Sequence, residues 1–160
     1  MSSSDSHKAI ITTLNGLIET NRDGEKGFTD AARHAHAPEL RTLMSRYAGD
    51  CARNTRELQA CVVEHGGKAE TGGTTIGALH RGWVNLKASL SNDDDLMLLE
   101  ECERGEDHAK AQYLKAIEEP LSSNVRTLLL GQRATTEVHH DHIRDLRNRG
   151  RAAAAAADAS

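Results

Sequence analysis

The chain has 160 residues, enough for one domain with a buried core. Its net charge is −4, its charges are interspersed, and one Phe, one Trp and two Tyr are its only large aromatic residues, so the basic, aromatic-bearing surface of a nucleic-acid-binding protein is absent. There is no membrane-length apolar run, no signal peptide and no CxxC pair among three cysteines, and we therefore expect a cytoplasmic protein without disulfides.

The first two predicted helices cover residues 6–35 and 38–65. Pro38 stands at a favoured first-turn position of the second helix, and Gly66 with Gly67 ends it. Apolar residues recur every three or four positions in both segments, as on the buried face of a helix. In the first helix this stripe comprises Ile11, Leu14, Ile18, Asn21, Glu25, Phe28 and Ala32.

Residues 66–91 predict a long crossover. A loop rich in glycine and threonine over 68–75 precedes a short helix over 76–90, which contains Trp83, the only tryptophan. Antiparallel neighbours need only a short turn, so a connection this long allows the next helix to run parallel to the second. We interpret His80 and Trp83 as packing residues.

The last two long helices follow the crossover. Asn92 to Asp95 form a strong helix start, and this third helix stops before Pro120. The fourth begins at Ser122 or Ser123. We expect one bundle domain over residues 1–150 and an alanine-rich, disordered tail over 151–160.

The two halves of the chain echo each other. Gly24-Glu25 in the first half corresponds to Gly105-Glu106 in the second, 81 residues later. Each half therefore predicts a helical hairpin, and two hairpins make an all-α four-helix bundle. In both halves the repeated glutamate falls on the face expected to be buried.

These glutamates predict a polar layer in the middle of the bundle. A buried carboxylate must be paired, protonated or bound to a metal. The fourth helix adds Glu137-x-x-His140, with His139 beside it, and this spacing occurs in carboxylate-bridged metal sites of helical bundles. We therefore consider Glu25, Glu106, Glu137, His139 and His140 as candidate ligands for iron, or for manganese or zinc.

The second helix does not complete a two-metal site, because Ala52 and Thr55 stand where a second ExxH would be needed. The alternative is a metal-free layer in which Glu25 and Glu106 hydrogen-bond to protein groups or buried water. The protein would then be a helical module for dimerisation or for docking a protein partner, with residues 79–90 supplying the surface. No nucleophile of the Ser/His/Asp or Cys/His kind can be assembled.

Several motifs, taken together, resemble a bacterial family of ferritin-like four-helix-bundle proteins catalogued as a domain of unknown function. The resemblance covers residues 8–149 and rests on Asn21-x-Asp23-Gly24-x-x-Gly27-Phe28, Leu79-His80-Arg81-Gly82-Trp83, Glu103-Arg104-Gly105-Glu106-Asp107, Gln132 and His140-Asp141-x-Ile143-Arg144. It implies a ferritin-like fold with helices in an up-down-down-up order, and no established activity.

Ferritins supply metal ligands from all four helices. By the resemblance, Glu25, Glu106 and Glu137 with His140 match three of these four positions, and the second helix departs from the pattern. The resemblance thus implies a degenerate site in metal handling or oxidative stress. Oxidoreductase-type metal chemistry is compatible with such a site, although the chain has no complete di-iron motif.

Overall fold

The computed structural model describes residues 3–70, 82–83, 85–91 and 94–159. Within these ranges every regular element is an α-helix, which confirms the predicted all-α class. The helices are α1 (Ser3–His34), α2 (Pro38–Glu64), α4 (Leu86–Ser91), α5 (Asp95–Ile117) and α6 (Ser123–Asp158).

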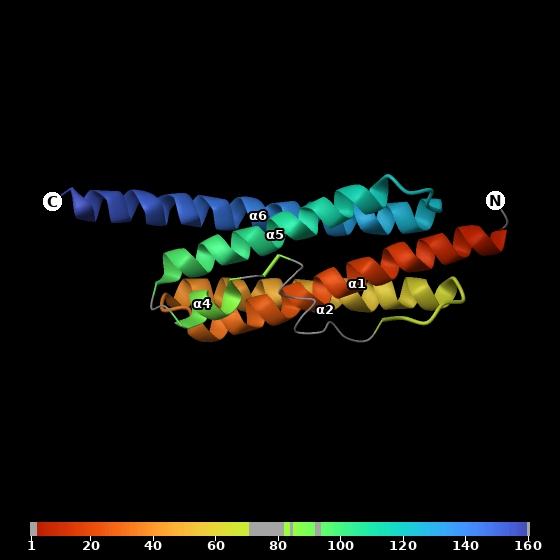
Figure 1. Cartoon of the computed structure of the whole chain (residues 1–160), viewed down its shortest axis with the longest axis horizontal. Coiled ribbons are helices and arrows are strands. Elements are labelled where there is room, and N and C mark those ends of the chain that lie inside the picture. Colours follow the sequence, from red (N-terminus) through yellow and green to blue (C-terminus); the bar gives the residue numbers. More distant parts are fainter. Residues whose placement is uncertain (1–2, 71–81, 84, 92–93, 160) are drawn as a thin grey trace.

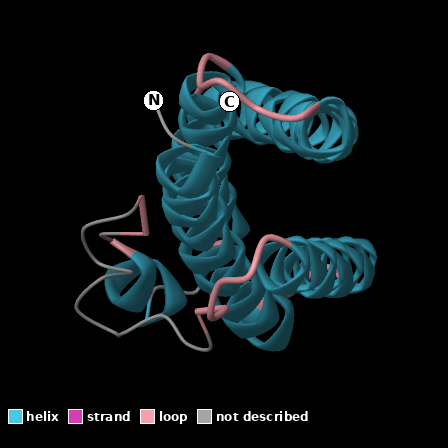
Figure 2. Cartoon of the chain, turned by 90° about the vertical axis from the view of Figure 1, so that its right-hand side faces the viewer, coloured by secondary structure: helices cyan, strands magenta, loops and turns pink. Residues whose placement is uncertain are grey.

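Four long helices form a bundle of two hairpins. Helices α1 and α2 pack along each other, as do α5 and α6, while α1 also contacts α5 and α2 approaches α6. Helices α1 and α6 run in one direction, and α2 and α5 run in the other (Figure 1). The parallel arrangement of α2 and α5 confirms the crossover between the hairpins, and Figure 2 shows α4 outside the four long helices.

Local chemistry sets the helix ends. Gly66 has a φ of 79°, a conformation that favours glycine. The Gly66 amide donates to the Val63 carbonyl at 3.0 Å and the Gly67 amide to the Val62 carbonyl at 3.0 Å, which forms a Schellman end for α2. The predicted stop of the second helix is therefore confirmed.

Asp94 and Asp95 serve two different helices. The Asp94 side chain accepts a hydrogen bond from the Leu96 amide and caps α5. The Asp95 carboxylate instead accepts from the backbone amides of His36 and Ala37, at 2.8 and 3.0 Å, just before α2. The acidic start of the third predicted helix therefore also fixes the turn between α1 and α2.

Trp83 in the crossover packs into a notch made by two glycines. A Cβ atom at Gly27 of α1 would lie 2.6 Å from the Trp83 ring, and one at Gly105 of α5 would lie 2.3 Å from it. Neither position can therefore carry a side chain while the indole stays in place, and the packing role predicted for Trp83 is confirmed. The predicted helix over 76–90 falls partly outside the described residues, within which α4 begins at Leu86.

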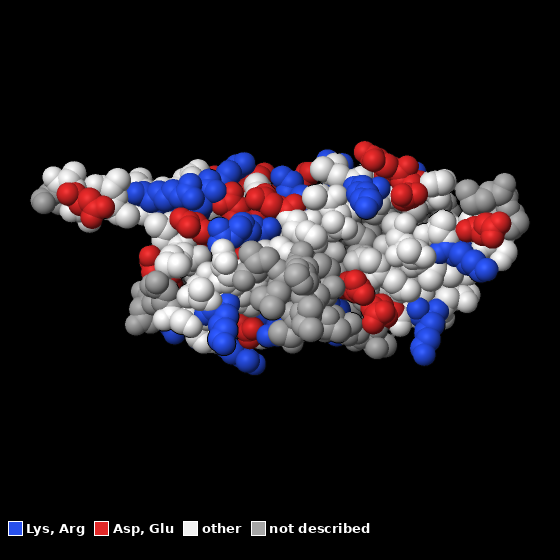
Figure 3. Space-filling view, viewed as in Figure 1, with Lys and Arg blue, Asp and Glu red and all other residues white. Residues whose placement is uncertain are grey.

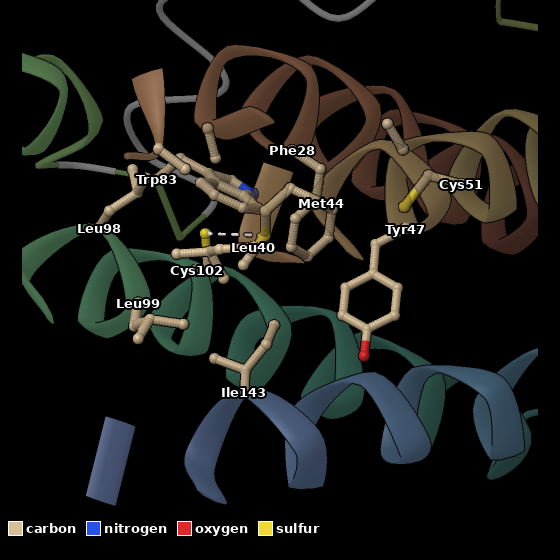
Figure 4. Packing of buried hydrophobic residues seen from close by; sticks show 13 residues of the cluster. Phe28, Leu40, Met44, Tyr47, Cys51, Trp83, Leu98, Leu99, Cys102 and Ile143 are labelled. Atoms are coloured by element: carbon tan, nitrogen blue, oxygen red, sulfur yellow. Dashed lines mark hydrogen bonds between the residues drawn. The ribbon is translucent and has the colours of Figure 1, made fainter. Parts of the chain in front are cut away.

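The apolar core consists of two clusters with polar side chains between them. One cluster includes Phe28, Leu40, Met44, Trp83, Leu99, Cys102 and Ile143 (Figure 4). The other includes Leu14, Ile18, Leu58, Val62, Tyr113, Val125 and Leu129. Along every long helix, buried polar residues occupy the turns between the two clusters, so the predicted polar layer lies at mid-bundle.

Helix α6 continues through the alanine run to Asp158, where the sequence suggested a disordered tail. Alanine has the highest intrinsic helix propensity, so the helix can continue beyond the bundle without tertiary packing. Residues 151–159 are exposed, and the end of α6 projects past the other helices (Figure 1).

Candidate metal centre

One part of the polar layer is an uncharged hydrogen-bond network that links all four long helices. Asn21 of α1 donates to the Tyr113 hydroxyl of α5 at 2.8 Å, and this hydroxyl donates to Gln132 Oε1 of α6 at 2.8 Å. Asn54 of α2 donates to Asn21 Oδ1 at 3.2 Å, and Gln132 Nε2 donates to the Asn54 carbonyl at 3.3 Å. Each buried amide thus has protein partners, which fixes the register of the helices.

The adjoining turn carries a buried carboxyl group. Glu106 is only 3 % exposed, and its Oε2 has no hydrogen-bond partner among the described residues. The imidazole of His139 is close to it, with Nδ1 3.8 Å from that oxygen. Burial, together with the nearby charge of Asp107, raises the pKa of Glu106 to about 8. Glu106 is therefore a neutral acid at neutral pH.

His139 connects this acid to the edge of the bundle. Its Nε2 lies 2.8 Å from Asp50 Oδ2 of α2, and its ring stacks on Tyr47 with centroids 3.8 Å apart. Burial lowers the pKa of His139, although the hydrogen bond with Asp50 opposes this effect. The ring is therefore positioned by α2 on one side while its other nitrogen faces Glu106.

A cavity of about 10 Å³ adjoins Glu106 and His139, which is room for about one water molecule. Asn21, Asn54 and Cys51 also line this cavity. Burial raises the pKa of the Cys51 thiol well above its usual value, with further contributions from Glu106, Asp50 and Glu25, so the thiol stays protonated. The cavity lining therefore offers the carboxyl group of Glu106 and the imidazoles of His108 and His139, without a thiolate.

A second group of ligand-type side chains lies at the α5–α6 contact. Glu103 and Asp107 are one turn apart on α5 and face His140 of α6. One ligand atom from each residue lies within 4.8 Å of the other two, and among the described residues this is the sole such group of three or more. His140 Nε2 lies 2.6 Å from Asp107 Oδ1 and 3.9 Å from Glu103 Oε1. We call these three residues the α5–α6 cluster.

Neighbouring side chains orient the α5–α6 cluster. Arg147 forms an ion pair with Glu103 Oε2, which leaves Oε1 directed toward His140. On the far side of the imidazole, His140 Nδ1 lies 3.3 Å from Asp141 Oδ1. This hydrogen bond holds the pKa of the Asp141 carboxyl below its usual value. In proteins, a ligating imidazole usually donates its other N–H to a carboxylate in this way.

The structure divides the five predicted ligands among separate places. Glu106 and His139 meet in the core, whereas His140 joins the α5–α6 cluster. Glu137 forms a surface ion pair with Arg133 at 3.1 Å, and Glu25 is half-buried on α1. Metal binding by these residues stays a prediction.

Sequence reasoning did not select Glu103 and Asp107 as ligands. Their spacing of four residues places both carboxylates on one face of a helix, and this spacing is the feature of the sequence that could have identified them as ligands. Both residues also belong to the motif Glu103-Arg104-Gly105-Glu106-Asp107, in which only Glu106 was considered as a ligand.

The fold defines the class of protein, a ferritin-like four-helix bundle. A mutant of Dps1 from Mycobacterium smegmatis is a similar solved structure, with a TM-score of 0.75 and 13 % sequence identity. The match covers 92 % of this chain and 99 % of that chain. It confirms the ferritin-like fold that the sequence predicted.

The family follows from the sequence itself. The family described as "Domain of unknown function (DUF2383)" matches residues 9–119, and the chain belongs to this family. No curated protein matches the chain. Within the described part of the chain, no helix combines the length and apolar character needed to cross a membrane.

Proposed function

We propose that this ferritin-like protein binds one divalent transition-metal ion at Glu103, Asp107 and His140. The observation that carries the proposal is the convergence of two carboxylate oxygens and one imidazole nitrogen within 4.8 Å. Bonds from a metal to such ligands measure about 2.0–2.2 Å, so an ion between the three groups requires only small side-chain movements.

The donor set favours iron, manganese or zinc over magnesium or calcium, because an imidazole accompanies the two carboxylates. Metal handling, including protection against oxidative stress, is the cytoplasmic role that we propose for such a site. One ion rather than a pair fits the residues, since α2 contributes no ligand to the cluster.

Binding would exchange protons for the ion. His140 Nε2 and Asp107 Oδ1 are 2.6 Å apart, a distance that requires a shared proton when no cation lies between them. A metal needs the lone pair of that nitrogen and therefore displaces the proton. We expect affinity to rise with pH, roughly tenfold per unit where one proton is released on binding.

Titration with Zn²⁺, Mn²⁺ and anaerobic Fe²⁺, followed by calorimetry and by elemental analysis after gel filtration, tests the proposal. The wild type should bind one ion per chain. Asp107→Asn should weaken binding at least tenfold, and it should fold normally because the Asp107 side chain is exposed.

Two further variants test where the ion binds. Glu100→Gln alters a carboxylate of the same helix that pairs with Arg151 outside the cluster, and it should bind like the wild type. Glu106→Gln should also bind like the wild type. Binding that is lost in Glu106→Gln and kept in Asp107→Asn would overturn the proposed site and place the ion in the core. Absence of stoichiometric binding by the wild type would overturn the function.

A metal-free interaction module is the second candidate function. The observation in its favour is the network of Asn21, Asn54, Tyr113 and Gln132, whose buried amides are satisfied by protein groups. An apo protein whose unfolding temperature does not respond to chelator or to added metal would support this function over the first.

A further inference from the structure

A groove with an apolar floor lies at the end of the bundle where α6 projects. It has a volume of about 400 Å³ and is formed by α2, α5 and α6 together with Ala37. Leu40, Leu43, Leu99 and Leu146 provide the floor and walls, while His142 and Arg149 lie along its α6 side. Leu43 and Leu146 keep part of their surface exposed.

The projecting end of α6 has the opposite shape. Residues 152–157 are six consecutive alanines on an exposed helix, followed by Asp158. In the space-filling view this stretch is a narrow, mostly uncharged rod with an acidic patch near its tip (Figure 3). We call residues 152–158 the alanine tail. It presents small apolar side chains on every side.

We propose that the alanine tail of a second copy of this chain occupies the groove. A twofold axis near Gly150 would place each tail in the groove of the other copy, so that one dimer contains two equal contacts. The inference is independent of metal binding, because none of Glu103, Asp107 and His140 lines the groove.

Length and direction support this occupant. Along α6 the groove extends from His142 to Arg149, about 10 Å at 1.5 Å per residue, and the alanine tail is about as long. In an antiparallel arrangement the tail would begin near Arg149 of the other copy and end near His142.

The charge at the Asp158 end of the tail supports the same orientation. Asp158 and the negative end of the helix dipole would then lie beside His142, a cation when protonated. The groove also contains two acidic residues, Asp95 and Glu39. The Asp95 carboxylate already accepts hydrogen bonds from the backbone amides of His36 and Ala37, and Glu39 would face only uncharged alanines. Alanine side chains also let a helix backbone approach the leucine floor closely.

The oligomeric state of the full chain tests the proposal. Sedimentation velocity between 5 and 200 µM should show a concentration-dependent dimer for the wild type. A tail variant with Ala152→Glu, Ala154→Glu and Ala157→Glu should be monomeric, because it puts charge on opposite sides of the tail while glutamate keeps the helix. Leu43→Glu in the groove should have the same effect. Circular dichroism should show that both variants are folded.

A matched control is Leu130→Glu, which changes an exposed leucine of α6 away from the groove and should leave the dimer intact. A wild type that is monomeric throughout, or a dimer that persists in the tail variant, would overturn the proposal.

Cross-linking shows which segments meet. One copy carries Leu43→Cys and the other carries cysteine at one alanine of the tail in turn, with Cys61→Ser in both because Cys61 is partly exposed. At least one tail position should form a disulfide between copies under mild oxidation. Absence of cross-links from all six positions in a dimeric sample would overturn the assignment of the tail to the groove.

Discussion

Two neighbouring parts of the polar layer differ in how their buried polar groups are satisfied. In the network of Asn21, Asn54, Tyr113 and Gln132, neutral donors and acceptors are matched across four helices. One to two turns away, Glu106 has a buried oxygen without a hydrogen-bond partner among the described residues, and His139 lies 3.8 Å from it.

The two regions differ in whether they need a proton or an ion from solution to satisfy their buried polar groups. The neutral network is complete without any proton or ion, so it stabilises the fold at every ordinary pH. Glu106 must take up a proton to remain buried, because its environment disfavours the charge. The neutral region therefore specifies the structure, whereas the ionisable region couples the structure to pH.

The largest expected effect comes from Glu106→Gln, measured with chelator present. The pKa of Glu106 is about 8 in the folded protein and near 4.5 when the chain is unfolded, so the folded state holds the extra proton between these values. The wild type should therefore lose stability as pH rises through this window, by up to roughly 1.4 kcal/mol per pH unit relative to Glu106→Gln.

Urea denaturation at pH 5, 7 and 9 measures this difference. The exposed Glu118→Gln is the control and should follow the wild type at each pH. Parallel pH profiles for the wild type and Glu106→Gln would show that Glu106 is ionised in the folded protein at neutral pH.

Tyr113→Phe should have the next largest effect, a loss of about 2–4 kcal/mol in the free energy of unfolding, because it leaves both Asn21 and Gln132 short of a partner. Unlike Glu106→Gln, this loss should vary little between pH 5 and 9. Tyr47→Phe is the comparison, since its hydroxyl reaches His142 at the exposed edge and should cost no more than about 1 kcal/mol. Equal losses for the two variants would argue against the buried network.

Gly105→Ala tests the packing next to Glu106 in the ionisable region, where the Trp83 ring covers α5. The new methyl group would lie 2.3 Å from the ring and should destabilise the protein by about 1–3 kcal/mol through overpacking. Gly131→Ala on α6 meets no atom within 4 Å and should instead stabilise by up to about 1 kcal/mol. Thermal unfolding of the two variants tests the opposite signs.

The smallest effect is expected at Glu137, the predicted ligand that lies outside both regions. Its partner Arg133 is also partly exposed, so Glu137→Gln should change stability by less than about 0.5 kcal/mol. Chemical denaturation of Glu137→Gln and the wild type at low and high salt measures this change in stability. A loss above 2 kcal/mol would mean that Glu137 belongs to the buried polar layer.

The sequence alone predicted much of the fold because the signals are local. Helical periodicity, Pro38, Gly66 and the capping residues depend on neighbours within one or two turns, and they located the long helices and the crossover. Apolar spacing also placed Asn21 on a buried face, where the structure has it.

The grouping of the ionisable residues was decided only by the tertiary structure. His139 and His140 are adjacent in sequence but point about 100° apart on a helix, so one faces Glu106 in the core and the other faces Glu103 and Asp107 on α5. The spacing of Glu137 and His140 suggested a shared site, yet Glu137 turns to Arg133. Such outcomes depend on the rotation of each helix against its neighbour, which is fixed by packing between distant segments and has no counterpart in local spacing.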